Sequence, residues 1–219
     1  MNRLIVGWHR GGLGYVRELL AGVGADVGMT FDRSTAEDNL SEKLEKSRRI
    51  EISPYIVPFL DRIYLENVEV VFVTRDPMRV LNSLYHYGVF RDDRPNKLRS
   101  FVFGARPDIE KHCKGLPAQA ICRYLSEWEK VIASHASKTI AVENGPYNLL
   151  HKIYDRPIDP GPLRTDINAS SCGQTLRPSD LPAGSRREIG RLLRDYRYRD
   201  DVWNPRGGHA HYINPDWHC

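Results

Sequence analysis

The chain has 219 residues, 41% of them hydrophobic and 27% charged, which suits one compact domain of ordinary globular composition. No apolar run approaches the roughly 18 residues of a membrane span, and the run Leu4–Val6 is too short for a secretory signal, so we expect a cytoplasmic protein with no membrane span. The net charge is +4, with 24 arginines among the 32 basic residues; this favours oxyanion partners, and the interspersed acidic residues exclude the basic stripe typical of nucleic-acid-binding proteins.

The first expected elements are a strand over Leu4–Val6, a glycine-rich turn, and a helix from Leu13 whose apolar residues recur at helical spacing until Gly24 closes it. The polar segment 33–49 is expected as an exposed helix or a mobile surface segment. The later elements, in chain order, are a short helix over Val57–Tyr64, a buried strand over Val68–Val73, a helix from Pro77, an irregular excursion over 88–116, a helix over Pro117–Ala136, a strand over Thr139–Val142, a helix over Pro146–Tyr154, a loop or lid over 156–184, and an arginine-rich helix over Ser185–Arg199.

Strands that alternate with helices favour an α/β fold, here a three-layer parallel sheet flanked by helices, of the P-loop nucleotide-binding type. Neither an internal repeat nor a linker is visible, so we expect one domain over 1–219 with an irregular C-terminal tail over 203–219. The four cysteines form no Cys-x-x-Cys pair, and therefore neither a zinc site nor a redox dithiol is expected.

A glycine-rich segment, GWHRGGLG over 7–14, joins the first strand to the first helix. Backbone N–H groups converge in such a turn, and the start of the helix adds a favourable dipole for a phosphate. The spacing of Gly7 and Gly12 matches a P-loop, but a nucleoside triphosphatase requires Lys and then Ser or Thr where this chain has Leu13 and Gly14. The loop therefore favours a 5′-phosphate or phosphosulfate held without a metal, with Arg10 as its cation. The alternative is a tight turn whose glycines serve backbone geometry alone.

The second motif ends the strand over Val68–Val73 and reads TRDP over 74–77. Arg75 emerges at the carboxyl end of this strand, where ligands bind in parallel α/β sheets. Ser83 follows about two helical turns later, so the Arg75 guanidinium and the Ser83 hydroxyl could bind one phosphate from two directions. The alternative for Arg75 is an ordinary cap and salt bridge to Asp76.

These two motifs, in this order, resemble those of the sulfotransferase family that uses 3′-phosphoadenosine 5′-phosphosulfate (PAPS). Arg-Asp-Pro followed by Ser83 and Tyr-His-Tyr is similar to the family's 3′-phosphate motif, and Gly7 to Tyr15 looks like its 5′-phosphosulfate loop. Weaker likenesses are Ser-Pro-Tyr at 53–55, Tyr-Leu-Ser-Glu-Trp at 124–128 and Ile-Ala-Val-Glu-Asn at 140–144, so the resemblance runs from residue 3 to about residue 150.

The resemblance implies PAPS as the cofactor, adenosine 3′,5′-bisphosphate (PAP) as its product, and no metal. It assigns Arg75 and Ser83 to the 3′-phosphate and places Tyr124 near the adenine. Arg10 becomes both a cofactor contact and a catalytic residue, because it would stabilise charge on the bridging oxygen as sulfate departs. The 5′-phosphosulfate is assigned to the backbone of five consecutive residues, namely Gly11, Gly12, Leu13, Gly14 and Tyr15.

The chain departs from the family's pattern at two points. Leu13 and Gly14 stand where its members carry hydroxyl residues, which removes two donors to the 5′-phosphate. The general base is commonly His or Glu, and Asp32 and His86 are the catalytic candidates here, with Glu51 as a rival. The alternatives are that Asp32 caps a helix and that His86 is a packing residue.

The predicted function is transfer of a sulfuryl group from PAPS to a hydroxyl or amine of a small-molecule or carbohydrate acceptor, with no nucleic acid as partner. We expect the segments 88–116 and 156–184 to bind the acceptor and to close over it. A non-catalytic protein that binds PAP or PAPS in regulation or assembly is the main alternative, and a P-loop nucleotide kinase is a weaker one.

Overall fold

The computed structural model describes residues 2–28, 31, 40–46, 50–93, 95–158 and 176–196. Asp32, the tail predicted over 203–219 and most of the lid predicted over 156–184 lie outside these residues. Within the described ranges, no helix combines the length and the apolar character that crossing a membrane requires.

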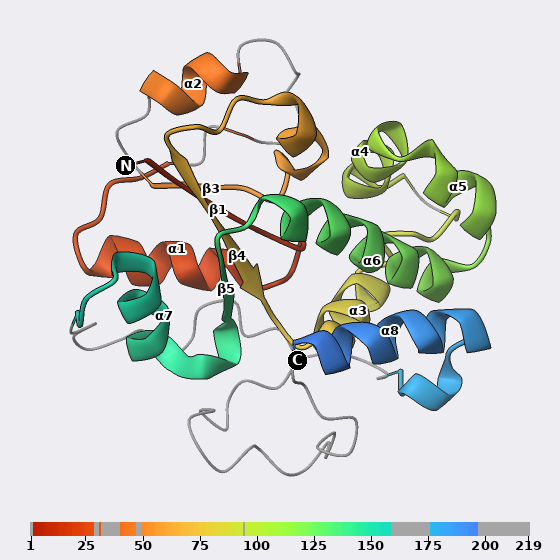
Figure 1. Ribbon diagram of the computed structural model, residues 1–219. Helices are drawn as coiled ribbons and strands as arrows, with labels where there is room; N and C mark the ends of the chain where they lie inside the picture. The colour runs from red at the N-terminus through yellow and green to blue at the C-terminus, as the bar shows by residue number, and fades with distance from the viewer. Residues whose placement is uncertain are drawn as a thin grey trace.

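The fold is built on a parallel sheet with the strand order β2-β3-β1-β4-β5 (Figure 1). Its strands are β1 (Asn2–Gly7), β2 (Val27–Gly28), β3 (Ile50–Ile52), β4 (Val68–Thr74) and β5 (Lys138–Ala141). The predicted α/β class with a parallel sheet is confirmed. Sequence patterns predicted three of these strands and missed β2 and β3.

Helices cover both faces of the sheet because apolar side chains on each strand alternate between them. They are α1 (Leu13–Gly22), α2 (Leu40–Lys46), α3 (Pro77–His86), α4 (Lys97–Ala105), α5 (Pro107–Cys113), α6 (Pro117–His135), α7 (Gly145–Tyr154) and α8 (Ala183–Asp195), with 3₁₀ turns η1 (Val57–Arg62), η2 (Val142–Asn144) and η3 (Pro178–Asp180). In β1, Ile5 packs towards α1 and α7, whereas Leu4 and Val6 pack towards α3, α6 and α8. The central strand is thus buried on both sides.

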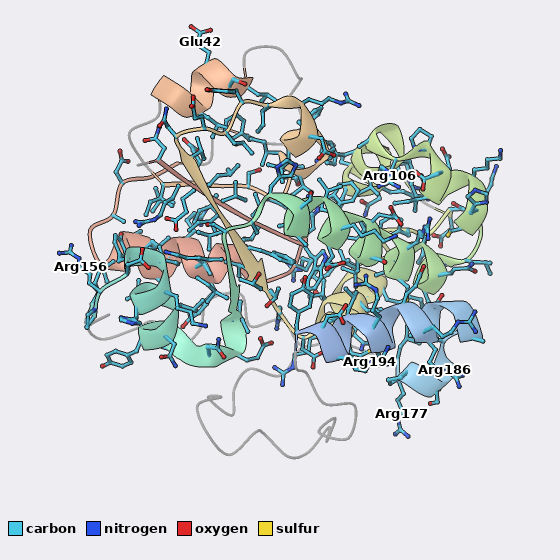
Figure 2. The ribbon with its side chains drawn as sticks, viewed as in Figure 1. Glu42, Arg106, Arg156, Arg177, Arg186 and Arg194 are labelled. Atoms are coloured by element: carbon cyan, nitrogen blue, oxygen red, sulfur yellow. The ribbon has the colours of Figure 1, made fainter. Side chains whose placement is uncertain are left out.

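The segment 88–116, predicted to be irregular, contains α4 and α5 instead. The side chain of Asn96 caps α4, because its Oδ1 accepts hydrogen bonds from the N–H groups of Leu98 at 3.0 Å and Arg99 at 3.2 Å. The side chain of Arg106, between the two helices, binds Asp108 and also Glu127 of α6 at 2.7 Å (Figure 2). These caps and ion pairs order a segment whose composition suggested a loop.

The edge of the sheet formed by the starts of β1, β4 and β5 carries a buried carboxylate. Glu69 is 8% exposed and accepts hydrogen bonds from Arg3 Nε at 2.6 Å and Lys138 Nζ at 2.8 Å. Burial alone would raise the pKa of Glu69, but the hydrogen bonds from Lys138 and Arg3 hold it below its ordinary value. The three side chains thus join three strands through one ionic cluster.

We expect Glu69→Ala to lower the free energy of unfolding by about 3 kcal/mol, because it removes the buried anion that two partly buried cations share. Asp155→Ala is the matched control, since Asp155 contacts the same Lys138 but is 61% exposed, and its loss should be much smaller. Urea denaturation of both variants gives the comparison. Equal losses would show that Glu69 is not the centre of the cluster.

Candidate functional site

The two sequence motifs meet because β1 and β4 are neighbours in the sheet. The strands are parallel, so both end at the same edge, and Gly7 lies opposite Val73 in the register. A Cβ atom on Gly7 would lie 2.6 Å from the carbonyl oxygen of Val73, so this position requires glycine. The loop after β1 and Arg75 after β4 therefore emerge at the same edge of the sheet from neighbouring strands.

The loop between β1 and α1 is held in a tight conformation. Arg10 has φ of 66° and Gly12 has φ of 91°, both in the left-handed region, and the N–H of Gly11 donates to the carbonyl of Trp8 at 2.9 Å. The fully buried indole of Trp8 donates from Nε1 to the carbonyl of Leu125 in α6 at 2.9 Å. A buried side chain thus anchors the base of the loop to a helix behind it.

Gly12 is the N-cap of α1 and contributes no side chain to capping. The first helical residues, Leu13 and Tyr15, are each 8% exposed, and their side chains pack into the core on that face of the sheet. The start of α1 can therefore contact a ligand through its main-chain N–H groups and the positive end of the helix dipole.

Gly12→Ala is expected to destabilise the protein by about 2–3 kcal/mol. A Cβ at this position would lie 2.7 Å from Cγ2 of Val142, and a left-handed alanine adds about 1–2 kcal/mol of backbone strain. Gly22→Ala, at the end of α1, is the matched control, because nothing lies within 4 Å of its Cβ and helix propensity favours alanine. In thermal unfolding, Val142→Ala should recover only the steric part of the Gly12→Ala loss; complete recovery would refute the backbone contribution.

Three residues of the two motifs are in direct contact. The Arg75 guanidinium donates from Nη1 to the carbonyl oxygen of Arg10 at 3.2 Å. Arg10 in turn donates from Nε to Oγ of Ser83 at 3.0 Å, and its guanidinium lies over the ring of Tyr87, 4.4 Å from the centroid. Ser83 is only 3% exposed, whereas Arg10 reaches the surface. The predicted cofactor contacts Arg10, Arg75 and Ser83 are therefore brought together.

The charges around Arg75 favour an added anion. Burial lowers the pKa of Arg75, an effect that Glu143 opposes and that the nearby guanidiniums of Arg79 and Arg10 reinforce. Burial and the proximity of Glu143 also raise the pKa of Asp76. Arg75 and its two cationic neighbours thus carry three positive charges next to the two carboxylates. A bound oxyanion would compensate the excess positive charge.

Asp76 acts as a helix cap directly after Arg75. Its carboxylate caps α3, where Oδ1 accepts a hydrogen bond from the N–H of Met78 at 2.8 Å. The N–H of Asp76 donates to Glu143 Oε1 at 3.0 Å. Within the described part of the chain, the Arg75 guanidinium donates to the Arg10 carbonyl, and Asp76 acts on Arg75 through its nearby charge.

The predicted contact of Tyr124 with the adenine is not supported by its position. Tyr124 is 0% exposed in α6, packed against Trp128 with a ring separation of 4.7 Å. Its hydroxyl lies 2.6 Å from Nδ1 of His9 and accepts a hydrogen bond from the N–H of His9 at 3.0 Å. A ring without exposed surface cannot stack on a ligand, so Tyr124 instead supports the loop from behind.

The three candidates for the general base have different surroundings. His86 is exposed at the end of α3, and its ring packs edge-on against Tyr87, which in turn contacts Arg10. Glu51 is 1% exposed within β3, which removes it from solvent and from any exposed acceptor. Asp32 lies outside the described residues. His86 is the candidate that the structure brings near the loop.

The sequence did not predict two contacts of the site. The Tyr87 ring over Arg10 was visible as part of Tyr-His-Tyr, but its partner lies in another motif. His9 stood inside the predicted loop, yet nothing in the sequence indicated its burial against α6. Both contacts depend on the pairing of distant segments.

No protein-family model matches this chain, and no curated protein matches it. Within the described part of the chain, no group of three or more His, Cys, Asp or Glu side chains is arranged to hold a metal ion.

Proposed function

We propose that the protein is a sulfotransferase of the P-loop nucleotide-binding type, which moves a sulfuryl group from PAPS to an acceptor hydroxyl or amine. The observation that carries this proposal is the convergence of Arg10, Arg75 and Ser83 at the carboxyl edge of β1 and β4. Two guanidiniums and a hydroxyl next to a glycine loop form a suitable cradle for the anionic groups of one nucleotide.

In this proposal Arg75 and Ser83 bind the 3′-phosphate, and the main chain of residues 11–15 binds the 5′-phosphosulfate. Ser83 Oγ accepts a hydrogen bond from Arg10, and its own O–H can donate to an oxygen of the 3′-phosphate at the same time. For catalysis, the Arg10 guanidinium turns from Ser83 towards the bridging oxygen of the bound nucleotide.

The reaction is an in-line displacement at sulfur. The acceptor oxygen or nitrogen forms a bond to sulfur, the bond between sulfur and the bridging phosphate oxygen breaks, and PAP leaves with that electron pair. Arg10 stabilises the charge that develops on this oxygen. A base takes the acceptor proton, and we propose His86 or Asp32 for this role, with the site providing mainly positioning and electrostatic stabilisation.

A second candidate is a non-catalytic protein that binds PAP or PAPS. The start of α1 favours this candidate. Leu13 is buried and Gly14 has no side chain, so these two residues can offer the 5′-phosphosulfate only main-chain contacts. A nucleotide kinase has less support, because the same two residues replace the lysine and the hydroxyl that hold triphosphate and magnesium.

Thermal unfolding with different nucleotides tests the proposed nucleotide class. We expect PAP to raise the melting temperature, whereas ATP with magnesium leaves it unchanged, because a ligand that binds only the folded state stabilises it. The reverse result would support a kinase and end the proposal. Transfer of labelled sulfate from PAPS to a mixed panel of alcohols and amines then separates an enzyme from a protein that only binds the nucleotide.

A further inference from the structure

His9 combines deep burial with an unused polar atom. Its side chain is 6% exposed and lies in the loop between β1 and α1, directly before Arg10. Nδ1 lies 2.6 Å from the hydroxyl of Tyr124, but Nε2 is buried and has no hydrogen-bond partner within the described ranges. Buried polar groups nearly always have a partner, so this atom requires an explanation.

The hydrogen bonds around Tyr124 determine which nitrogen of His9 carries the proton. The Tyr124 oxygen already accepts the main-chain N–H of His9 at 3.0 Å. If the Tyr124 hydroxyl donates its one proton to Nδ1, both groups are satisfied, and the proton of the imidazole resides on Nε2. The opposite tautomer would leave the Tyr124 proton and the Nε2 lone pair both without partners. Nε2 is therefore a hydrogen-bond donor that lacks an acceptor.

Burial supports the neutral form of this imidazole, because it lowers the pKa of His9 to about 3. At neutral pH the ring consequently presents one N–H to its surroundings. A protonated Nε2 cannot accept a proton, and so His9 does not compete with His86 or Asp32 as the general base.

On the side that faces α4, His9 is surrounded by aromatic side chains that are partly exposed. Its ring lies 4.6 Å from the ring of Tyr55 and 6.3 Å from that of Phe101, and these two rings are 5.1 Å apart. Tyr55 and Phe101 are both partly exposed. Phe101 also lines a surface hollow of about 390 Å³ at the start of α4, together with Pro95, Asn96, Lys97 and Ser100. Phe101 therefore belongs both to the aromatic cluster around His9 and to the hollow.

We propose that this hollow is the entrance of the acceptor site, and that Nε2–H of His9 donates a hydrogen bond to an oxygen atom of a small ring-containing acceptor. The inference rests on the proposed function, since it assigns the acceptor to the loop that precedes Arg10. The apolar body of the acceptor packs against Tyr55 and Phe101, and the Phe101 ring moves aside to admit it, because Nε2 is shielded in the unoccupied protein. His9 is then an acceptor-binding residue that keeps its own proton.

Nuclear magnetic resonance of protein labelled with ¹⁵N-histidine tests this directly, with p-cresol as probe and toluene as the control that lacks oxygen. At pH 7 we expect His9 to show a protonated Nε2 and an unprotonated Nδ1. Saturating p-cresol should shift the Nε2–H resonance, whereas toluene should leave it nearly unchanged. His9→Phe should weaken p-cresol binding about tenfold, as expected for one lost hydrogen bond, and leave toluene binding unaltered.

Ser100→Trp provides a second variant that does not disturb the loop, because Ser100 is exposed at the rim of the hollow. A bulky ring there should block the entrance and abolish the p-cresol shift at His9. The proposal is overturned if Nε2 is unprotonated, if p-cresol and toluene give the same shift, or if the shift persists in Ser100→Trp. The last result would place the probe elsewhere.

PAP binding measured on the same samples keeps this inference separate from the proposed function. If p-cresol contacts His9 as expected but PAP does not bind, the sulfotransferase proposal fails and the His9 site stands. If PAP binds and p-cresol fails to shift Nε2–H, the nucleotide site stands and the His9 site is refuted.

Discussion

Arg75→Ala is expected to weaken PAP binding about 100-fold. Arg75 is partly buried, contacts the loop through the Arg10 carbonyl, and faces the position proposed for the 3′-phosphate. Charge-assisted hydrogen bonds from a guanidinium to a phosphate contribute about 1.5–3 kcal/mol each, and the proposed contact would be bidentate. Isothermal titration calorimetry measures the loss of PAP affinity. Arg75→Lys should recover only part of that affinity, because lysine lacks the planar, bidentate guanidinium.

Two matched variants make this result specific. Arg194→Ala removes an arginine that is exposed on α8, and it should leave PAP affinity unchanged (Figure 2). Ser83→Ala removes one neutral donor from the same cradle and should cost about tenfold. Because Arg75 also braces the loop, the melting temperature without ligand must be compared as well. Unchanged PAP affinity in a folded Arg75→Ala variant would refute the assigned site.

The second large effect concerns stability in acid and again involves His9. Burial lowers the pKa of His9 from 6.5 to about 3, so between these values the unfolded chain binds a proton that the folded protein does not. The stability that a neutral His9 confers is therefore complete above pH 6.5 and is lost as the pH falls towards 3. The loss is of the order of 5 kcal/mol at the acid limit.

Urea denaturation from pH 7 to pH 3.5 should show this loss in the wild type and a shallower decline in His9→Phe. At pH 7 the variant should itself be less stable, because the Tyr124 hydroxyl loses its partner. The two curves of stability against pH should consequently converge and then cross in acid. His151→Phe, on the exposed side of α7, is the control and should run parallel to the wild type. Parallel curves for His9→Phe would show that His9 is not held neutral by burial.

The core of the site was predictable from sequence because its two motifs each end a strand. Arg75 follows an apolar run rich in β-branched residues, and Gly7 follows a shorter apolar run. These two patterns were enough to predict that both residues lie at the carboxyl edge of a parallel sheet. Their contact through Arg10 then required only that β1 and β4 be neighbours. That adjacency is a property of topology, which sequence periodicity does not specify.

Two of the missed elements, β2 and β3, lacked a clear local signal. β2 and β3 have two and three residues, too few for a recognisable period, and they are strands because β1 provides a pairing edge. α4 did carry a helical pattern, with apolar residues at 98, 101, 102 and 105 after the capping residue Asn96. The Arg, Asp, Pro and Gly residues around it outweighed that pattern in the prediction.

The burial of Tyr124 and His9 could not be predicted for a different reason. The sequence identified a helix with an apolar face and a loop that contains a histidine, but whether a given side chain points to ligand or to core depends on how α6 crosses β1. The distance between the two residues along the chain is more than a hundred positions. Long-range packing of this kind leaves no periodic trace in either segment.

The strand order also has a consequence for the protein during synthesis. β1 is synthesised before β4, yet six of its residues pair with β4, which emerges more than sixty residues later. β3 can pair earlier with Arg3, Leu4 and Ile5, but Val6 and Gly7 gain a strand partner only from β4. The glycine-rich loop that follows Gly7 therefore gains the strand pairing at its base only after β4 has been translated.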